Sequence, residues 1–238
     1  MRKNCAVPGL TSVRDGLSSN RLQRILEGLP SGDAEQVGRL LAGSASVEIE
    51  PGVPYLGTSF TTAALLMVEE GFVVLRAAFP ELSRSAITCE ARPGGLLLPP
   101  RPEEALFGLG ASRVRTISAE DRDTLLSRPA VAQWVVEQLT SALGQKQEAI
   151  ANFAPTRHVE RVQRKLLQLA RTHGHVVRDG VRIDFPVSHA LLAEMIGSSR
   201  ETVTRAIDEL QRTGFVARHG SIYVVRASPE ALSVVPST

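Results

Sequence analysis

The sequence is short of the features that mark several protein classes. Its 238 residues include two cysteines, Cys5 and Cys89, and no Cys-x-x-Cys pair. Two cysteines can pair with each other, but they cannot build a disulfide framework or supply the four thiolate ligands of an iron–sulfur cluster. No stretch approaches the ~20 apolar residues of a membrane-spanning helix, and no apolar segment follows the basic N-terminal residues. We therefore expect a cytoplasmic protein without a membrane partner.

A net charge of either sign is nearly absent. The formal value of +2 for the whole chain says little about any partner. The distribution is uneven, because residues 155–238 hold 12 of the 27 basic and 8 of the 25 acidic residues, a net of +4 that leaves −2 for the remainder. All five histidines also lie in this part. A basic C-terminal region favours a polyanionic partner, although chance asymmetry would give the same numbers.

The N-terminal half predicts a β-rich domain. Residues 19–43 show the spacing of apolar residues that is typical of helices. Between residues 46 and 118, short runs of β-forming residues alternate with turn signals such as PGVP (51–54) and RPGG (92–95). The runs are SVEIE, ALLMVEE, FVVLRAAF, RSAITCEA and RVRTIS. Short strands separated by regular turns predict an antiparallel barrel or sandwich.

A long helical tract is predicted next, over about residues 119–153. Its apolar residues recur at three- and four-residue spacing, which places them in one stripe. This stripe either packs back on the β domain or pairs with the same helix of a second copy. We favour pairing, because polar side chains occupy the other faces, as in a two-helix seam. The stripe comprises Val131, Val135, Leu139, Ala142, Leu143, Ala149, Ile150 and Phe153.

The remainder of the chain predicts short helices and hairpins. Pro155 ends the long tract, and a new helix from about residue 156 stops near Gly174. A hairpin follows around Asp179-Gly180, a dipeptide that favours tight hairpin turns. Two helices at about residues 188–196 and 199–213 come next. The last hairpin turns at His219-Gly220.

The two helices between residues 188 and 213 have the spacing of a helix-turn-helix. A small residue at Ala193 allows the second helix to approach the first. Gly197 supplies the backbone conformation of a sharp turn, and Val203 fills the gap between the helices. Val203, Ala206, Ile207 and Leu210 follow the i, i+3, i+4, i+7 pattern of a buried face.

The opposite face of the second helix carries charged side chains in its first turns: Arg200, Glu201, Thr204 and Arg205 lie together there. In the major groove of DNA, arginine can donate two hydrogen bonds to guanine and glutamate can accept one from cytosine. Readers of this kind belong at the N-terminal end of a recognition helix, which enters the groove most deeply. The pattern therefore predicts DNA bases as the target of Arg200, Glu201 and Arg205.

A local explanation of the same charges stays open. Ser198-x-x-Glu201 has the spacing of a capping box, which would occupy the glutamate within the protein. Arg205 has Asp208 and Glu209 at helical spacing and can form surface ion pairs with them.

The same segments resemble the CRP/FNR (catabolite-activator-like) family of bacterial transcription regulators. The resemblance rests on RKLLQLA, RDGVRIDFPVSHALLAEMIG, SSRETVTRAIDEL and HGSIYVV, within residues 156–226. It implies an α+β protein with an N-terminal antiparallel, jelly-roll-like β-roll sensor domain, a dimerisation helix and a C-terminal winged helix-turn-helix. On this reading the three parts are residues 19–118, 119–154 and 155–228.

The resemblance also implies roles and partners. Arg200, Glu201 and Arg205 match the family's base-reading positions, Ser199 and Thr202 would lie near phosphates, and Thr204 would support them. The implied partners are double-stranded DNA with a near-palindromic operator, a second copy in a homodimer, and RNA polymerase. Whether an effector binds is not implied.

The sensor half departs from the family's cyclic-nucleotide pattern. The stretch after Gly94-Gly95 lacks the Gly-Glu of a phosphate cradle, and the prolines at 99, 100 and 102 would break the small helix that holds the phosphate. Arg113 is the side chain left to reach an anion. We therefore expect no cyclic nucleotide and no iron–sulfur cluster as cofactor, while haem bound through Cys89 or a histidine stays open.

Other signals for chemistry are weak. Gly108-Leu109-Gly110 begins like a dinucleotide fingerprint, but Arg113 stands in place of the third glycine. His173-x-His175 has no further ligand at suitable spacing, so we expect two solvated histidines rather than a metal site. No catalytic arrangement stands out, and we do not expect an enzyme. The alternative is a ligand-sensing or protein-interaction module whose winged helix binds another protein.

Overall fold

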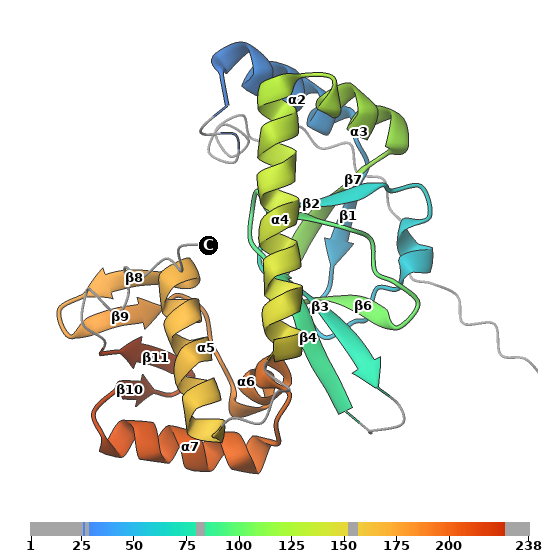
Figure 1. The fold of residues 1–238 in the computed structure, drawn as a ribbon. Coiled ribbons are helices and arrows are strands. Elements are labelled where there is room, and N and C mark those ends of the chain that lie inside the picture. The colour runs from blue at the N-terminus through green and yellow to red at the C-terminus, as the bar shows by residue number, and fades with distance from the viewer. Residues whose placement is uncertain (1–25, 27–28, 80–83, 152–156, 227–238) are drawn as a thin grey trace, which may run out of the picture. The chain divides into compact units, whose positions relative to one another are not determined.

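The computed structural model describes residues 26, 29–79, 84–151 and 157–226 of the chain. They form two compact units (Figure 1). We call strands β1 to β7 and helices α2 to α4 the β domain; they make up the first unit, except that residues 79–87 and 147–151 group with the second. The second, from α5 to β11, is the winged domain. Each is described by itself.

The β domain contains two sheets, with strand orders β1-β7-β2-β5 and β4-β3-β6. The pairs β1–β7, β2–β7, β2–β5 and β3–β6 run antiparallel. All five predicted runs are strands, whereas β5 and β6 were not predicted, because the prolines between them read as loop. The strands are β1 (Ser46–Ile49), β2 (Leu65–Glu70), β3 (Val73–Phe79), β4 (Arg84–Ala91), β5 (Leu96–Leu97), β6 (Glu104–Gly108) and β7 (Ser112–Ile117).

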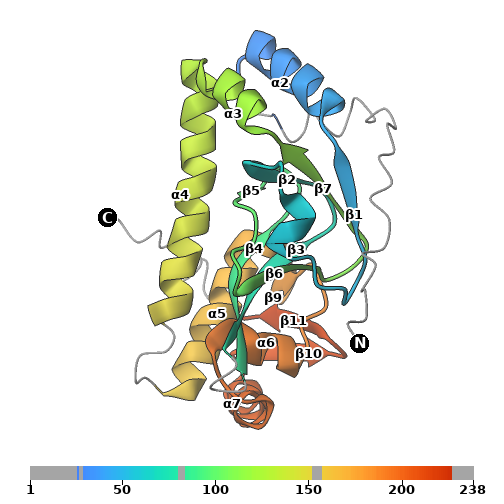
Figure 2. The same ribbon diagram turned by 90° about the vertical axis from the view of Figure 1, so that its right-hand side faces the viewer.

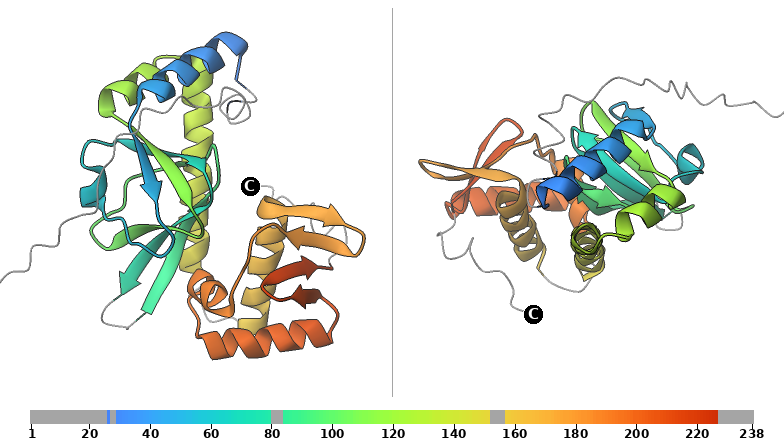
Figure 3. Two further views of the ribbon diagram at one scale, coloured as in Figure 1. Left: turned by 180° about the vertical axis from the view of Figure 1, so that it is seen from behind. Right: turned by 90° about the horizontal axis from the view of Figure 1, so that it is seen from above.

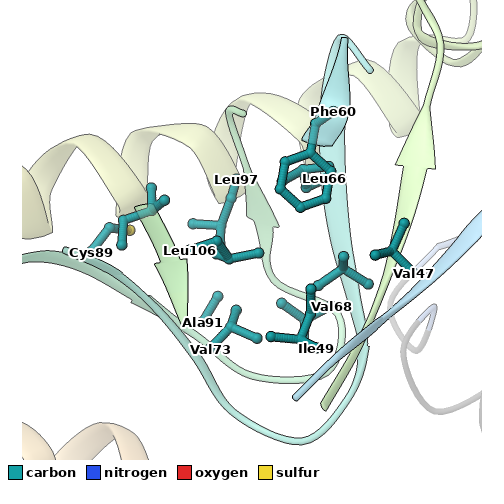
Figure 4. Packing of buried hydrophobic residues seen from close by; sticks show 12 residues of the cluster. Val47, Ile49, Phe60, Leu66, Val68, Val73, Cys89, Ala91, Leu97 and Leu106 are labelled. Atoms are coloured by element: carbon teal, nitrogen blue, oxygen red, sulfur yellow. The ribbon is translucent and has the colours of Figure 1, made fainter. Parts of the chain in front are cut away.

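Strand β2 shows why the domain has an apolar layer on each side of its first sheet. Successive side chains of a strand point to opposite faces. Leu66 and Val68 face the interior between the strands, where an apolar cluster fills the space (Figure 4). Leu65 and Met67 face the helices on the other side. A strand covered on both faces reads as a continuous apolar run, as LLMV does here.

Helices α2 (Ser31–Gly43), α3 (Ala119–Leu126) and α4 (Pro129–Ala151) cover the β domain (Figure 2). The tract expected as one helix is broken between α3 and α4, because proline lacks the N–H that would continue the helix and disfavours helical backbone in the residue before it. Pro129 becomes the first residue of α4, a position that proline tolerates. Leu22 and Ile25 of the expected N-terminal helix lie outside the described residues.

Four of the eight stripe residues of α4 pack on its own β domain, so the expectation that the stripe pairs with a second copy is wrong for these four. Val131 and Val135 are buried in the cluster with Leu65 and Met67, and Leu139 packs against that cluster. Ala142 packs against the interior cluster. The sequence shows the stripe but not what covers it. Leu143 is the exception, with 57% of its surface exposed. Phe153 and the side chain of Ile150 lie outside the described residues.

The winged domain consists of three helices and a four-stranded sheet of order β10-β11-β9-β8 (Figure 3). Its elements occur where the sequence predicts them, including α5's end before Gly174, where a Cβ would lie 2.4 Å from the Ala170 carbonyl oxygen. They are α5 (His158–His173), β8 (Gly174–Val177), β9 (Gly180–Ile183), α6 (His189–Ile196), α7 (Arg200–Arg212), β10 (Val216–His219) and β11 (Ile222–Val225).

Candidate nucleic-acid interface

The turn between α6 and α7 has the predicted geometry. Gly197 adopts φ 61° and ψ 45°, in the left-handed region that favours glycine. The Ser198 N–H donates to the Ala193 carbonyl oxygen at 2.9 Å, which closes the turn. Ala193 is buried, as its place between the helices requires. The turn thereby fixes the direction in which α7 leaves α6.

Helix α7 has one buried and one exposed face. Val203 and Ile207 are fully buried and Leu210 is 4% exposed, so this face holds the helix against the rest of the winged domain. Arg200, Glu201 and Arg205 are exposed. Glu201 and Arg205 are exposed because they lie opposite the buried residues of the helix. Arg200 is exposed as the first residue of α7.

The first turn of α7 is capped by Ser199, not by Ser198. The Thr202 N–H donates to Ser199 Oγ at 3.2 Å. The alternative of a capping box from Ser198 to Glu201 is therefore wrong, because the cap falls one residue later and leaves the glutamate outside it. Among the described residues, the side chains of Arg200, Glu201 and Arg205 make no hydrogen bond or ion pair, including with Asp208 or Glu209. Their polar groups are available to a partner.

Three hydroxyl side chains were expected beside the proposed base-reading residues, and all three form hydrogen bonds within the protein. They are Ser199, Thr202 and Thr204. Ser199 Oγ lies 2.9 Å from Thr202 Oγ1 in addition to its capping bond. Thr204 Oγ1 donates to the Arg200 carbonyl oxygen at 2.9 Å and lies 2.8 Å from His189 Nδ1. This placement fits a supporting role for all three and leaves their expected nearness to phosphates a prediction.

His189 and Arg218 are neighbours of this face that sequence reasoning missed. Burial lowers the pKa of His189, and the charges of Arg218 and Arg200 lower it further, against the opposing effect of Asp208. Arg218 lies on β10 with its guanidinium 5.7 Å from the centre of the Tyr223 ring. His189 and Arg218 are 29 residues apart in sequence, so no local pattern brings them together.

A buried arginine anchors the end of α6. Arg161, on the inner face of α5, is 7% exposed and its Nη1 donates to the Ile196 carbonyl oxygen at 3.5 Å. Its Nη2 lies 2.5 Å from His158 Nδ1. Burial and then Arg161 lower the pKa of His158. The only sequence signal is a charged residue within an otherwise apolar face.

His173, the last residue of α5, and His175, on β8, lie in different environments. His173 is 6% exposed and its ring meets Phe185 edge-on, so the expectation that it is solvated is wrong. His175 is exposed and its Nδ1 contacts Asp184 Oδ1. Within the described part of the chain, no group of three or more histidine, cysteine or acidic side chains could hold a metal ion.

The β domain has an apolar cluster inside it, and it also buries charged side chains such as Glu69, Glu104 and Arg115. Arg113, the side chain expected to reach an anion, lies on β7 with its Nη2 3.4 Å from Glu48 Oε1, and both side chains are solvent-accessible. Cys89 is buried, and burial raises the pKa of its thiol to about 12. Its Sγ donates to Gln145 Oε1 at 3.3 Å, so the thiol is a contact between β4 and α4.

Comparisons with known proteins find a family and relatives for this chain. Residues 160–233 match the family described as the Crp-like helix-turn-helix domain. The global nitrogen regulator of Synechococcus elongatus is 36% identical over 109 residues, which are 46% of this chain and 49% of that protein. The transcriptional regulator SdrP of Thermus thermophilus is 30% identical over 177 residues, 73% of this chain and 82% of SdrP.

The fold is shared more widely than the sequence. A CooA mutant from Carboxydothermus hydrogenoformans superposes with a TM-score of 0.71 over 92% of this chain and 96% of that one, at 14% sequence identity. The chain spans about half the length of the first curated relatives it matches. The expected α+β fold is thus confirmed, with an antiparallel N-terminal domain and a C-terminal winged helix-turn-helix. No helix in the described ranges is long and apolar enough to cross a membrane.

Proposed function

Because the chain belongs to the CRP/FNR family of bacterial transcription regulators, we propose that it is a sequence-specific DNA-binding regulator that inserts α7 into the major groove. The matched relatives are regulators of transcription, and no catalytic role is proposed. The regulator would then activate or repress RNA polymerase at the promoter. We propose this partner because the chain belongs to the family.

The observation that carries the proposal is the exposed edge of α7. Arg200, Glu201 and Arg205 project from the first two turns of a helix whose other face is buried, and no group of the described residues bonds to their side chains. Unoccupied guanidinium and carboxylate groups at the start of a recognition helix match the donors and acceptors of guanine and cytosine. We assign base reading to these three residues.

We propose a homodimer that pairs through an exposed strip of α4 that shares Leu143 with the predicted stripe and otherwise lies outside it. Val136 and Leu143 are large apolar side chains that are 58% and 57% exposed. They lie seven residues apart, on the same side of the helix; the exposed positions Thr140 and Gly144 beside them carry no charge, and Glu137, which accepts a hydrogen bond from Gln133, borders the strip. An uncharged apolar strip with heptad spacing suits a two-helix seam. A two-fold dimer would place two copies of α7 on half-sites about one helical turn apart.

The dimer is tested by introducing charge into this strip. Val136→Glu with Leu143→Glu should convert a dimer into a monomer in sedimentation velocity and weaken binding to a two-half-site operator. Leu126→Glu is the matched control, because Leu126 is an exposed apolar residue on α3 outside the strip. A monomeric wild type, or a doubly substituted chain that stays dimeric, would contradict this interface.

We propose that neither a cyclic nucleotide nor an iron–sulfur cluster is needed for DNA binding. The apolar cluster described inside the β domain takes side chains from β1 to β7, and these offer no partner to a phosphate or a sugar (Figure 4). Arg113 pairs with Glu48, and Cys89 is a protonated buried thiol. Operator affinity should be unchanged by added cyclic nucleotides and by anaerobic purification. A gain in affinity with either would refute this part.

The whole proposal is tested by selecting bound sequences from a random duplex pool, with and without cell extract. A near-palindromic consensus is expected, and extract should not change it. Affinity for the selected duplex should fall steeply with salt, because each phosphate contact releases counterions. If no duplex is enriched and no salt dependence appears, the winged domain binds something other than DNA, such as another protein.

A further inference from the structure

The contact between His189 and Thr204 joins the first helix of the pair to the first turns of α7. His189 stands at the start of α6, directly after its N-cap Ser188. Its Nδ1 lies 2.8 Å from Thr204 Oγ1, which lies 2.9 Å from the Arg200 carbonyl oxygen. These two contacts form a chain of hydrogen bonds that ends on the backbone of a proposed base reader.

These two hydrogen bonds fix which nitrogen of the His189 ring carries the proton. A carbonyl oxygen can only accept a hydrogen bond, so Thr204 donates its hydroxyl proton to the Arg200 carbonyl oxygen. Thr204 Oγ1 therefore accepts from His189, and Nδ1 is the protonated nitrogen. Nε2 is then the basic nitrogen, and in the described structure it is buried without a hydrogen-bond partner. An unprotonated, unpartnered acceptor is where an added proton would go.

The charges around His189 belong largely to the surface that would meet DNA. Arg218 faces it from β10, and Arg200 and Asp208 face it from α7. Burial and the two arginines hold the pKa of the ring below its ordinary value, so the ring is uncharged near neutral pH. The negative charge of the DNA around the two arginines would offset their effect on the ring and remove part of the reason that the ring stays neutral.

We propose that His189 is a positioning residue for α7, which it holds through Thr204, and that it takes up a proton when the winged domain binds DNA. The inference rests on the proposed function. DNA affinity should then rise as the pH falls, in the window between the pKa of His189 in the free protein and its higher pKa in the complex. One proton changes the dissociation constant by at most about tenfold per pH unit.

Two substitutions separate positioning from protonation. His189→Asn keeps an N–H donor near the place of Nδ1 but cannot be protonated. His189→Ala removes both the donor and the titrating group. At about pH 8, above the ordinary histidine pKa of ~6.5, Asn should recover affinity that Ala loses. Below that pH, both variants should lack the part of the pH dependence that His189 contributes.

The test is calorimetry on the selected duplex at fixed salt, in two buffers that differ in ionisation enthalpy, which reports the number of protons taken up on binding. The wild type should take up more protons than His189→Asn, by a fraction of one up to one. His175→Asn is the matched control, because His175 contacts Asp184 on the β8–β9 hairpin, and it should behave as the wild type does.

Equal proton uptake by the wild type and His189→Asn would overturn the inference and leave the proposed function intact. Failure of the wild type to bind any duplex would overturn both. If the Ala variant does not fold, as judged by circular dichroism, the comparison of wild type with Asn still decides the question of the proton.

Discussion

Replacing Gly197 by alanine should loosen the helix-turn-helix by an amount that its backbone angles set. The observed φ 61° and ψ 45° lie close to the ideal left-handed values. A residue with a Cβ pays about 1–2 kcal/mol to adopt them, and the stiffer unfolded chain does not compensate at a positive φ. Gly197→Asn should cost less, because asparagine enters this region several times more often than most residues.

Amide hydrogen exchange of the full chain, resolved by peptide, measures this cost where it arises. A loss of about 1–2 kcal/mol raises the unfolded fraction roughly 5–30-fold, so the slowest amides of α6 and α7 should exchange faster by that factor. Gly32→Ala is the control, since a Cβ there meets nothing within 4 Å. Wild-type exchange rates in Gly197→Ala, or equal costs for Ala and Asn, would refute the reasoning.

Three further predictions concern the β domain. Arg115 Nε and Glu69 Oε2 are 2.9 Å apart in side chains that are 5% and 6% exposed. Arg115→Met should therefore lower the free energy of unfolding by about 3–5 kcal/mol, measured by urea unfolding with tryptophan fluorescence, and adding Glu69→Gln should recover part of this loss. If the effects of the two substitutions simply add, the two side chains are not a coupled pair. The Cys89 thiol, whose pKa burial raises to about 12, should resist alkylation at about pH 8 until urea unfolds the domain, as peptide mass spectrometry would show. Burial alone would raise the pKa of Glu104, but the hydrogen bond and charge of Lys146 outweigh it and lower that pKa. A carboxyl group whose pKa is lowered by folding stabilises the fold above its unfolded pKa, and this stability is lost as the pH falls through its folded pKa. The difference in the free energy of unfolding between wild type and Lys146→Met, measured by denaturant titration, should therefore shrink below about pH 4. A difference that does not change with pH would contradict the ion pair.

The winged domain was largely predictable because its signals are local. Gly197, Ala193 and Val203 act on neighbours within one supersecondary unit, and the buried face of α7 repeats at the helical period. The N-cap was misplaced because Ser198 and Ser199 are adjacent serines with the same chemistry. Only the backbone angles distinguish them, since the capping residue is extended and the residue after it is helical.

What the sequence missed depends on tertiary contacts. The stripe with Val131 and Val135 was visible, but a stripe does not say whether its cover comes from the same chain or a second copy. β6 was hidden because Pro99, Pro100 and Pro102 precede it and read as loop. The contact of His189 with Thr204 joins two helices, so it follows from the packing angle that Gly197 sets and not from either residue alone.

The most direct test of base reading is the affinity of Arg200→Ala for the selected operator and for random duplex, measured by fluorescence anisotropy at one salt concentration. If Arg200 reads a base, the substitution should cost about 1–3 kcal/mol on the operator, relax the preference at one base pair of each half-site and leave random-duplex affinity nearly unchanged. An equal loss on both duplexes would show that Arg200 contacts only the backbone and would contradict the assignment.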